Sequence, residues 1–136
     1  MKIALCLDDK NGMMFGGRRQ SMDEQLRQDL LQTVGTACLW MSPYSAGQFA
    51  FLPETVRVDP DFLEKAGDED WCFVEDADIL PAAHRVTQLA IYRWNRHYPS
   101  DRKFPIEVFR DRWQLISRRE FPGKSHETIT LEVYAL

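Results

Sequence analysis

Residues 37–46 read ACLWMSPYSA, and this stretch decides the fold class. The apolar run Ala37–Met41 is typical of a strand that is buried on both faces of a parallel sheet. Ser42 and Pro43 follow it directly, and this pair is typical of a helix N-cap followed by proline in the first helical turn. A buried strand that leads straight into a short helix, here over residues 43–49, indicates an α/β domain.

Upstream of this stretch, residues 21–34 predict a longer helix. Ser21-Met22-Asp23-Glu24 has the form of a capping box, so we expect the helix to begin at Ser21. Apolar residues then recur every four positions, which predicts one buried face, and Gly35 follows as a stop signal. The glycine pair Gly16-Gly17 before this helix predicts a mobile connecting loop.

Short apolar runs elsewhere in the chain have the composition of strands. They occupy residues 2–7, 55–58, 71–74 and 89–94, and a further short helix is expected at 60–66. Strands that alternate with helices over short connections predict a mostly parallel central sheet with flanking helices.

The C-terminal part differs because two strand-like runs follow each other without a helix between them. Trp113–Ser117 and Ile129–Ala135 are expected to pair as an antiparallel hairpin, joined by the long loop 118–128. No internal repeat, low-complexity tract or linker interrupts the chain, so we expect a single domain over residues 1–136.

The composition is that of an ordinary globular protein, with 44% hydrophobic and 28% charged residues. No apolar run approaches the roughly 20 residues that span a bilayer, and the apolar start Met1–Leu7 is too short for a signal peptide. We therefore expect a cytoplasmic protein with no membrane partner. The three cysteines lie in the apolar runs ALCL, ACLW and WCFV, which predicts reduced core thiols and no disulfide or metal site.

The net charge of −4 is unevenly distributed along the chain. Residues 54–78 carry ten acidic and two basic side chains, whereas residues 79–136 carry ten basic and six acidic ones. Two solvated surfaces of opposite sign account for this pattern, and the acidic balance argues against a dedicated nucleic-acid binder. The acidic groups at 68–70 and 75–78 lack the spacing of a calcium loop, so we expect a solvated acidic turn there.

Several motifs occur in an order that defines a family resemblance. The first strand and its turn read ALCLDDKNGMM, the next strand and helix start read LWMSPYS, and the last third contains VTQLAIYRW, SDRKFP, WQLI and TLEVY. Together they resemble a shortened dihydrofolate reductase over most of the chain. The resemblance implies a dihydrofolate-reductase-like α/β fold: a mostly parallel central sheet, flanking helices and an antiparallel C-terminal hairpin.

The positions that carry activity in that family are mostly replaced here. The family has a tryptophan before the first helix and an acid on that helix, whereas Gly16–Gln20 holds no tryptophan and Leu26 falls at the acid's position. Its Gly-Arg-x-Thr cofactor motif corresponds to Ser42-Pro43-Tyr44-Ser45, which keeps a hydroxyl but loses the arginine. Its Gly-Gly pair beside the pyrophosphate corresponds to FVEDADILP, whose three carboxylates repel phosphate. We therefore expect the fold without a cofactor.

The chain also resembles a group of short bacterial proteins to which the name ribonuclease Z has been applied. That enzyme family needs a His-x-His-x-Asp-His cluster to hold zinc and generate a metal-bound hydroxide. His84, His97 and His126 stand singly and more than ten residues apart, so the sequence argues against a zinc nuclease and no metal is expected.

The leading hypothesis is a protein that binds a small anionic ligand or a protein partner in the remaining cleft. Two arginines follow the glycine pair and lead into a helix N-terminus, an arrangement that favours anions. A tyrosine and a serine lie at the start of the next helix, where the resemblance places phosphate binding. The candidate ligand-binding residues are therefore Arg18, Arg19, Tyr44 and Ser45.

Two other functions stay open. An NADPH-dependent reductase of a pterin-like heterocycle would use Asp23 or Glu24 as its proton source. A nucleic-acid-interacting module would contact phosphates through a set of basic side chains near the aromatic run RWNRHY, with a steep salt dependence. These basic residues are Arg93, Arg96, Arg118 and Arg119.

Ser125-His126-Glu127 lies within the long loop 118–128 and contains the letters of a catalytic triad. Catalytic triads, however, converge from separate segments of the chain. Adjacent residues on an extended chain point to opposite faces, so we expect this tripeptide to be a solvated loop.

Overall fold

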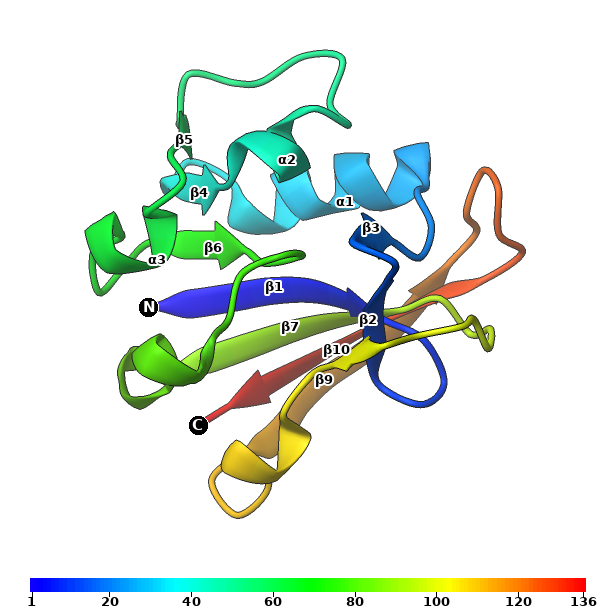
Figure 1. Ribbon diagram of the computed structural model, residues 1–136. Helices are drawn as coiled ribbons and strands as arrows, with labels where there is room; N and C mark the ends of the chain where they lie inside the picture. The colour runs from blue at the N-terminus through cyan, green and yellow to red at the C-terminus, as the bar shows by residue number, and fades with distance from the viewer.

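The strands form one seven-stranded sheet and one small three-stranded sheet, as the computed structural model of residues 1–136 shows (Figure 1). Five neighbouring strands of the large sheet run parallel, in the order β5 (Val56–Val58), β4 (Leu39–Met41), β6 (Trp71–Phe73), β1 (Lys2–Leu7) and β7 (Gln88–Arg93). Two antiparallel strands complete it, β10 (Ile129–Ala135) beside β7 and β9 (Gln114–Phe121) at the edge. The expected α/β class, with its parallel centre and C-terminal hairpin, is confirmed.

Helices cover both faces of the large sheet. The helices α1 (Glu24–Val34) and α2 (Pro43–Ala46) lie on one face (Figure 1). The other face is packed by α3 (Phe62–Lys65) and by two 3₁₀ helices, η1 (Leu80–Arg85) and η2 (Ile106–Val108). None of these helices has the length and apolar character needed to span a lipid bilayer.

Strand β1 shows why the central strands read as apolar runs. Ile3 and Leu5 are fully buried in the cluster that α3 and η1 cover, whereas Ala4 between them is buried in the cluster beneath α1. Successive side chains of a strand point to opposite faces, so a strand covered on both faces has no solvent-facing position. Each large apolar side chain buried in this way stabilises the fold by about 1.5–3 kcal/mol.

The prediction for the cysteines holds best for Cys72. All three thiols are free, and Cys72 is fully buried, while Cys6 and Cys38 are partly buried. Burial raises the pKa of the Cys72 thiol to about 12, so it stays protonated at neutral pH.

The small sheet consists of β3 (Arg18–Arg19), β2 (Gly12–Phe15) and β8 (Arg102–Lys103). Gly16 and Gly17 form the turn between β2 and β3, and both have a positive φ, of 60° and 74°. Two-residue hairpin turns of the primed types need positive φ at their central positions, which glycine adopts without strain. The glycine pair, expected within a connecting loop, therefore forms the turn of a hairpin whose strands pair on both sides of it.

The longer helix begins later than its capping-box pattern predicts. α1 starts at Glu24, and its N-cap is Asp23, whose side chain accepts hydrogen bonds from the backbone N–H groups of Gln25 and Leu26. Met22 is 48% exposed and contributes nothing to the apolar face. Ser21 stays outside the helix because its hydroxyl contacts a side chain from a distant loop, as described below.

The C-terminal hairpin is longer than expected. β9 continues to Phe121, which pairs with Ile129 at the start of β10, so the connecting loop shrinks to residues 122–128. Polar and charged side chains occupy most of the added residues, and their alternation with apolar ones is weak. The composition predicts that β9 ends at Ser117, but backbone hydrogen bonds to β10 extend it to Phe121.

Candidate functional site

The carboxyl ends of β1, β6 and β7 meet at one edge of the sheet. The hairpin β2–β3, residues 20–23 and the loop 122–128 gather at this edge (Figure 1). Open parallel sheets place their ligand sites outside the carboxyl ends of their strands. Buried polar side chains at this edge therefore define the candidate site.

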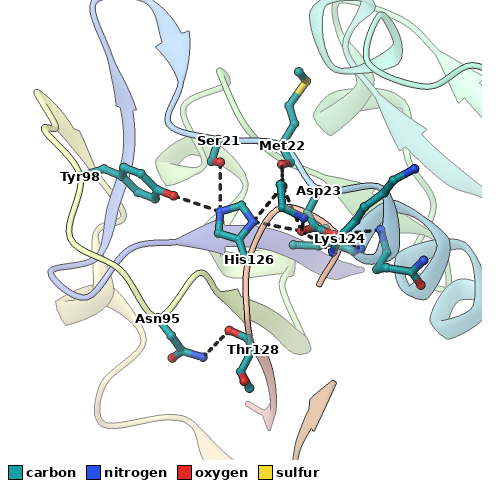
Figure 2. A network of polar contacts seen from close by, with 11 residues as sticks. Ser21, Met22, Asp23, Asn95, Tyr98, Lys124, His126 and Thr128 are labelled. Atoms are coloured by element: carbon teal, nitrogen blue, oxygen red, sulfur yellow. Dashed lines mark hydrogen bonds and ion pairs between the residues drawn. The ribbon is translucent and has the colours of Figure 1, made fainter. Parts of the chain in front are cut away.

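The centre of the site is a buried carboxylate–imidazole pair. Oδ2 of Asp23 lies 3.0 Å from Nδ1 of His126, and the two side chains are 0% and 2% exposed (Figure 2). His126 comes from the loop between β9 and β10, 103 positions further along the chain. The expectation of a solvated loop at 125–127 is therefore wrong for His126, because the loop folds back onto the start of α1.

Every lone-pair direction of the Asp23 carboxylate faces a donor. Besides capping α1, its two oxygens accept hydrogen bonds from the backbone N–H of Lys124 at 3.1 and 3.0 Å and from that of Ser125 at 2.9 Å. The hydroxyl of Ser125 lies 3.1 Å from Oδ2. Burial by itself would raise the pKa of Asp23, but these hydrogen bonds and the contact with His126 outweigh it and hold the pKa well below the usual range.

The ionised carboxylate fixes the state of the histidine ring. We assign a proton to Nδ1 because the Asp23 carboxylate can only accept there, and in that tautomer Nε2 is the acceptor nitrogen. Two hydroxyls face Nε2, namely Oγ of Ser21 at 3.1 Å and Oη of Tyr98 at 3.0 Å. The hydroxyl of Ser125 lies at the other ring nitrogen, 3.1 Å from Nδ1, and it also contacts Oδ2 of Asp23 at 3.1 Å and the Met22 carbonyl at 2.8 Å.

Aromatic stacking and a close backbone approach hold the ring in place. The indole of Trp94, which is 4% exposed, stacks on His126 with ring centres 4.6 Å apart. Asn95, with a positive φ of 59°, donates to the Thr128 carbonyl at 3.1 Å and so ties the segment after β7 to this loop. A Cβ at Gly123 would lie 2.6 Å from Oδ2 of Asp23, so the loop comes this close only because residue 123 is glycine.

Two backbone donors beside Ser21 are free. The N–H groups of Ser21 and Met22 donate no hydrogen bond within the protein. They directly precede Asp23, the N-cap of α1, where the helix dipole places partial positive charge. The serine hydroxyl thus lies beside unused N–H donors of the kind that stabilise a developing oxyanion.

An ion pair closes the neighbouring part of the cleft. Nε of Arg19 lies 3.0 Å from Oε2 of Glu75, the side chain of Gln48 donates to the other carboxylate oxygen at 2.9 Å, and the guanidinium stacks 4.2 Å from the centre of the Tyr44 ring. The cavity left between Arg19, Ser21, Glu75 and neighbouring side chains is about 10 Å³. That volume is about one water molecule's worth of space.

The thiol of Cys6 also lines this small cavity. Burial, together with the nearby Glu75 carboxylate, raises the pKa of Cys6 well above its ordinary value. The thiol is therefore protonated at neutral pH.

The structure brings together two of the four predicted ligand-binding residues. Arg19 and Tyr44 are in contact through the stacked ring and through the backbone N–H of Arg19, which donates to Oη of Tyr44 at 2.9 Å. Arg18 is exposed on β3 and makes no ion pair. Ser45 is fully buried, and its backbone N–H is bonded to the N-cap hydroxyl of Ser42 at 3.2 Å.

The residues named for the two alternative functions lie apart from one another. Asp23 is the buried carboxylate described above, whereas Glu24 points to the surface and bonds to Lys124. Among the basic side chains of the nucleic-acid hypothesis, Arg96 is exposed, and the other three pair with carboxylates. These pairs are Arg93 with Glu132, Arg118 with Glu120, and Arg119 with Asp29.

Sequence reasoning placed His126 in a solvated loop and Trp94 and Tyr98 in an aromatic run of the nucleic-acid hypothesis, and it assigned Ser21 to a helix cap. The N-cap signal of Asp23 was present in the sequence, but nothing local indicates that a loop a hundred residues away caps the same carboxylate. No group of three or more histidine, cysteine, aspartate or glutamate side chains is arranged to hold a metal ion.

The strand order, the parallel centre and the closing hairpin define a dihydrofolate-reductase-like fold. Among solved structures, the dihydrofolate reductase from Enterococcus faecalis complexed with NADP(H) and RAB-propyl superimposes with a TM-score of 0.66, covering 98% of this chain and 94% of that one. Sequence identity over this match is 11%, so the likeness is one of fold. No protein-family model and no curated protein sequence matches the chain.

Proposed function

We propose that this protein is a hydrolase that cleaves esters with a short acyl group through an acyl-enzyme on Ser21. One observation carries the proposal: Asp23 Oδ2, His126 Nδ1, His126 Nε2 and Ser21 Oγ follow one another, with contacts of 3.0 Å and 3.1 Å. This is the order of groups in an Asp-His-Ser triad, which is recognised by geometry and roles rather than by position in the sequence.

The reaction would proceed in two balanced steps. Ser21 Oγ attacks the ester carbonyl carbon while its proton passes to His126 Nε2, and the alcohol leaves with that proton as the tetrahedral intermediate collapses. A water molecule then attacks the acylated Ser21, giving its proton to Nε2, and the free acid departs as Oγ recovers a proton. Asp23 keeps the ring oriented and stabilises the imidazolium, while the N–H groups of Ser21 and Met22 face the oxyanion.

The size of the cleft restricts the substrate. The enclosed space beside Ser21 is about 10 Å³, room for about one water molecule, so the site has no pocket for a long acyl chain. Ser21 itself is half-buried, which leaves the leaving group on the solvent side. A short-chain aryl ester such as p-nitrophenyl acetate is therefore the expected substrate, and p-nitrophenyl octanoate is expected to react poorly.

Covalent labelling with a small fluorophosphonate tests the proposal. The wild-type protein is expected to gain one phosphonyl group on Ser21, with loss of fluoride, and mass spectrometry of peptides locates it. Ser21→Ala should remove the label, whereas Ser117→Ala, which changes an exposed serine on β9, should label like the wild type. Absence of any label, or a label on Ser125 in place of Ser21, would overturn the proposal.

NADPH-dependent reduction is a second candidate, favoured by the similarity of fold to a reductase complexed with NADP(H). In that case His126 Nε2 is better placed to supply a proton than Asp23, whose oxygens are all bonded, or Glu24, which faces solvent.

Binding of a small anion in the same cleft, through Arg18, Arg19, Tyr44 and Ser45, is also proposed. Arg19 already forms an ion pair with Glu75 in this cleft, so an anion would have to displace the Glu75 carboxylate.

Thermal unfolding separates these candidates. A ligand at roughly 100 times its dissociation constant stabilises the native state by about 2.7 kcal/mol, which raises the midpoint by several degrees in a domain of this size. With millimolar NADPH or phosphate we expect no rise. A rise with NADPH would support the reductase, and a rise with phosphate that Arg18→Ala and Arg19→Ala abolish would support the anion site.

A further inference from the structure

A second and larger pocket lies between α3 and η1. Its volume is about 440 Å³, within the range of about 300–1,000 Å³ that is common for small-molecule sites. The buried side chains of Phe62 and Ala82 form part of its lining, together with Leu63 and Pro81. α3 lies close in space to the N-terminus and away from the hairpin β2–β3 (Figure 1), and the pocket shares no lining residue with the small cavity beside Ser21, so the two sites are separate.

The charged groups of this pocket are mostly acidic. Asp61, Glu64 and Asp78 line it, and the carboxylates of Asp61 and Glu64 make no ion pair or hydrogen bond within the protein. Asp78 accepts one hydrogen bond, from the backbone N–H of Leu80 at 3.0 Å. The pocket thus combines an apolar lining with two carboxylates that have no partner of their own.

The single basic side chain of the pocket is engaged elsewhere. Arg85 donates to the carbonyl of Leu63 at 3.1 Å and to that of Ala66, and it lies 3.7 Å from the Asp68 carboxylate. Its guanidinium therefore ties α3 to η1 and does not neutralise Asp61 or Glu64. The pocket also lies in the segment where acidic residues outnumber basic ones by ten to two, so the surrounding field is negative.

We propose that this pocket binds an organic amine with an apolar body, such as a protonated aryl-alkyl amine. The apolar lining would cover the body of the ligand, and the free carboxylates of Asp61 and Glu64 would face its ammonium group. An anionic ligand of the same shape is disfavoured because three carboxylates line the pocket. This proposal stands independently of the ester hydrolysis proposed for Ser21.

A matched set of probes tests the charge preference. We would titrate the protein with 2-naphthylmethylamine, 2-naphthalenemethanol and 2-naphthoate, which share one apolar body, and measure dissociation constants by isothermal titration calorimetry at low salt. The amine is expected to bind up to about tenfold more tightly than the alcohol, as contacts with two or three exposed carboxylates allow. The naphthoate is expected to bind most weakly.

Charge-removing variants locate the site. The double substitution Asp61→Asn and Glu64→Gln should abolish the preference for the amine, whereas Glu69→Gln, which removes an exposed carboxylate outside the pocket, should leave it intact. Equal affinity for the three probes, no binding of any of them, or an equal loss in both variants would overturn the proposal. Unchanged hydrolysis of p-nitrophenyl acetate in the double variant keeps the outcome distinct from the Ser21 site.

Discussion

Replacing Asp23 with alanine is expected to lower the free energy of unfolding by about 3–5 kcal/mol. The carboxylate is fully buried and joins three parts of the chain, because it caps α1, accepts the N–H groups of Lys124 and Ser125, and contacts His126. Loss of a helix cap costs about 1 kcal/mol, and each buried donor left without a partner costs about 1–3 kcal/mol. Few single side chains in this fold satisfy so many groups.

Urea unfolding followed by circular dichroism at pH 7 measures this effect. Glu24→Ala is a matched control, since it removes the next acidic side chain along the chain, whose ion pair with Lys124 is exposed. Exposed pairs contribute about 0–1 kcal/mol, so the control should change stability little. Equal destabilisation by the two substitutions would show that the loop 122–128 is not anchored through Asp23.

The lowered pKa of Asp23 predicts that the free energy of unfolding depends on pH. Its pKa is lower in the folded protein than the value of about 3.9 expected in the unfolded chain. Its stabilising contribution is therefore complete above about pH 4–5 and is lost as the pH falls toward the folded-state pKa. The stability difference between the wild type and Asp23→Asn should be largest near neutral pH and should shrink below pH 4.

Substitution of His126 by alanine is expected to lower the rate of p-nitrophenyl acetate hydrolysis by about 10²–10⁴-fold, the usual contribution of a general base. Without the imidazole, nothing within hydrogen-bond reach accepts the proton of Ser21 as it attacks. Steady-state rates are measured at a temperature where circular dichroism shows the variant to be folded. The cavity left by the ring allows added imidazole to restore part of the rate, measured above the hydrolysis that the same imidazole causes without the protein, and a purely structural role would not permit this rescue.

Tyr98→Phe serves as the matched control for this experiment. It removes the second hydroxyl at His126 Nε2, 3.0 Å away, and leaves Ser21 as the remaining hydroxyl partner of that nitrogen. The rate should stay within a few-fold of the wild type or rise. If Tyr98→Phe lost as much activity as His126→Ala, or if the histidine variant kept full activity, the assignment of Ser21 as nucleophile would be wrong.

The fold followed from the sequence where structure depends on near neighbours. The apolar run ending at Met41, the N-cap Ser42 and the spacing of Leu26, Leu30 and Val34 each act over a few residues, and the structure confirms the strand and both helices. Errors arose at boundaries set by contacts with other elements. The N-cap of α1 is Asp23 and not Ser21, because His126 contacts the serine hydroxyl, and β9 is longer because β10 offers pairing partners as far as Phe121.

The residues of the candidate site were predicted less well than the fold, because their contacts join distant parts of the chain. Sequence patterns selected Arg19 and Tyr44, and the two side chains are in contact. Arg19 also forms an ion pair with Glu75, and this pair closes the part of the cleft where an anion was expected. Neither the exposure of Arg18 nor the burial of Ser45 is visible in the local sequence. Pairing of charges depends on which strand ends lie side by side, and that depends on the whole sheet order.

By itself, then, the sequence determined the α/β class, the buried parallel strands and the C-terminal hairpin, since alternation, capping and turn chemistry act within a few residues. Only the tertiary structure decided that Asp23 and His126 meet, because they lie 103 residues apart and the folded-back loop 122–128 joins them. An isolated histidine in a polar loop carries no local signal of burial. Its environment is created by Trp94, Tyr98 and the start of α1, which converge only when the sheet has formed.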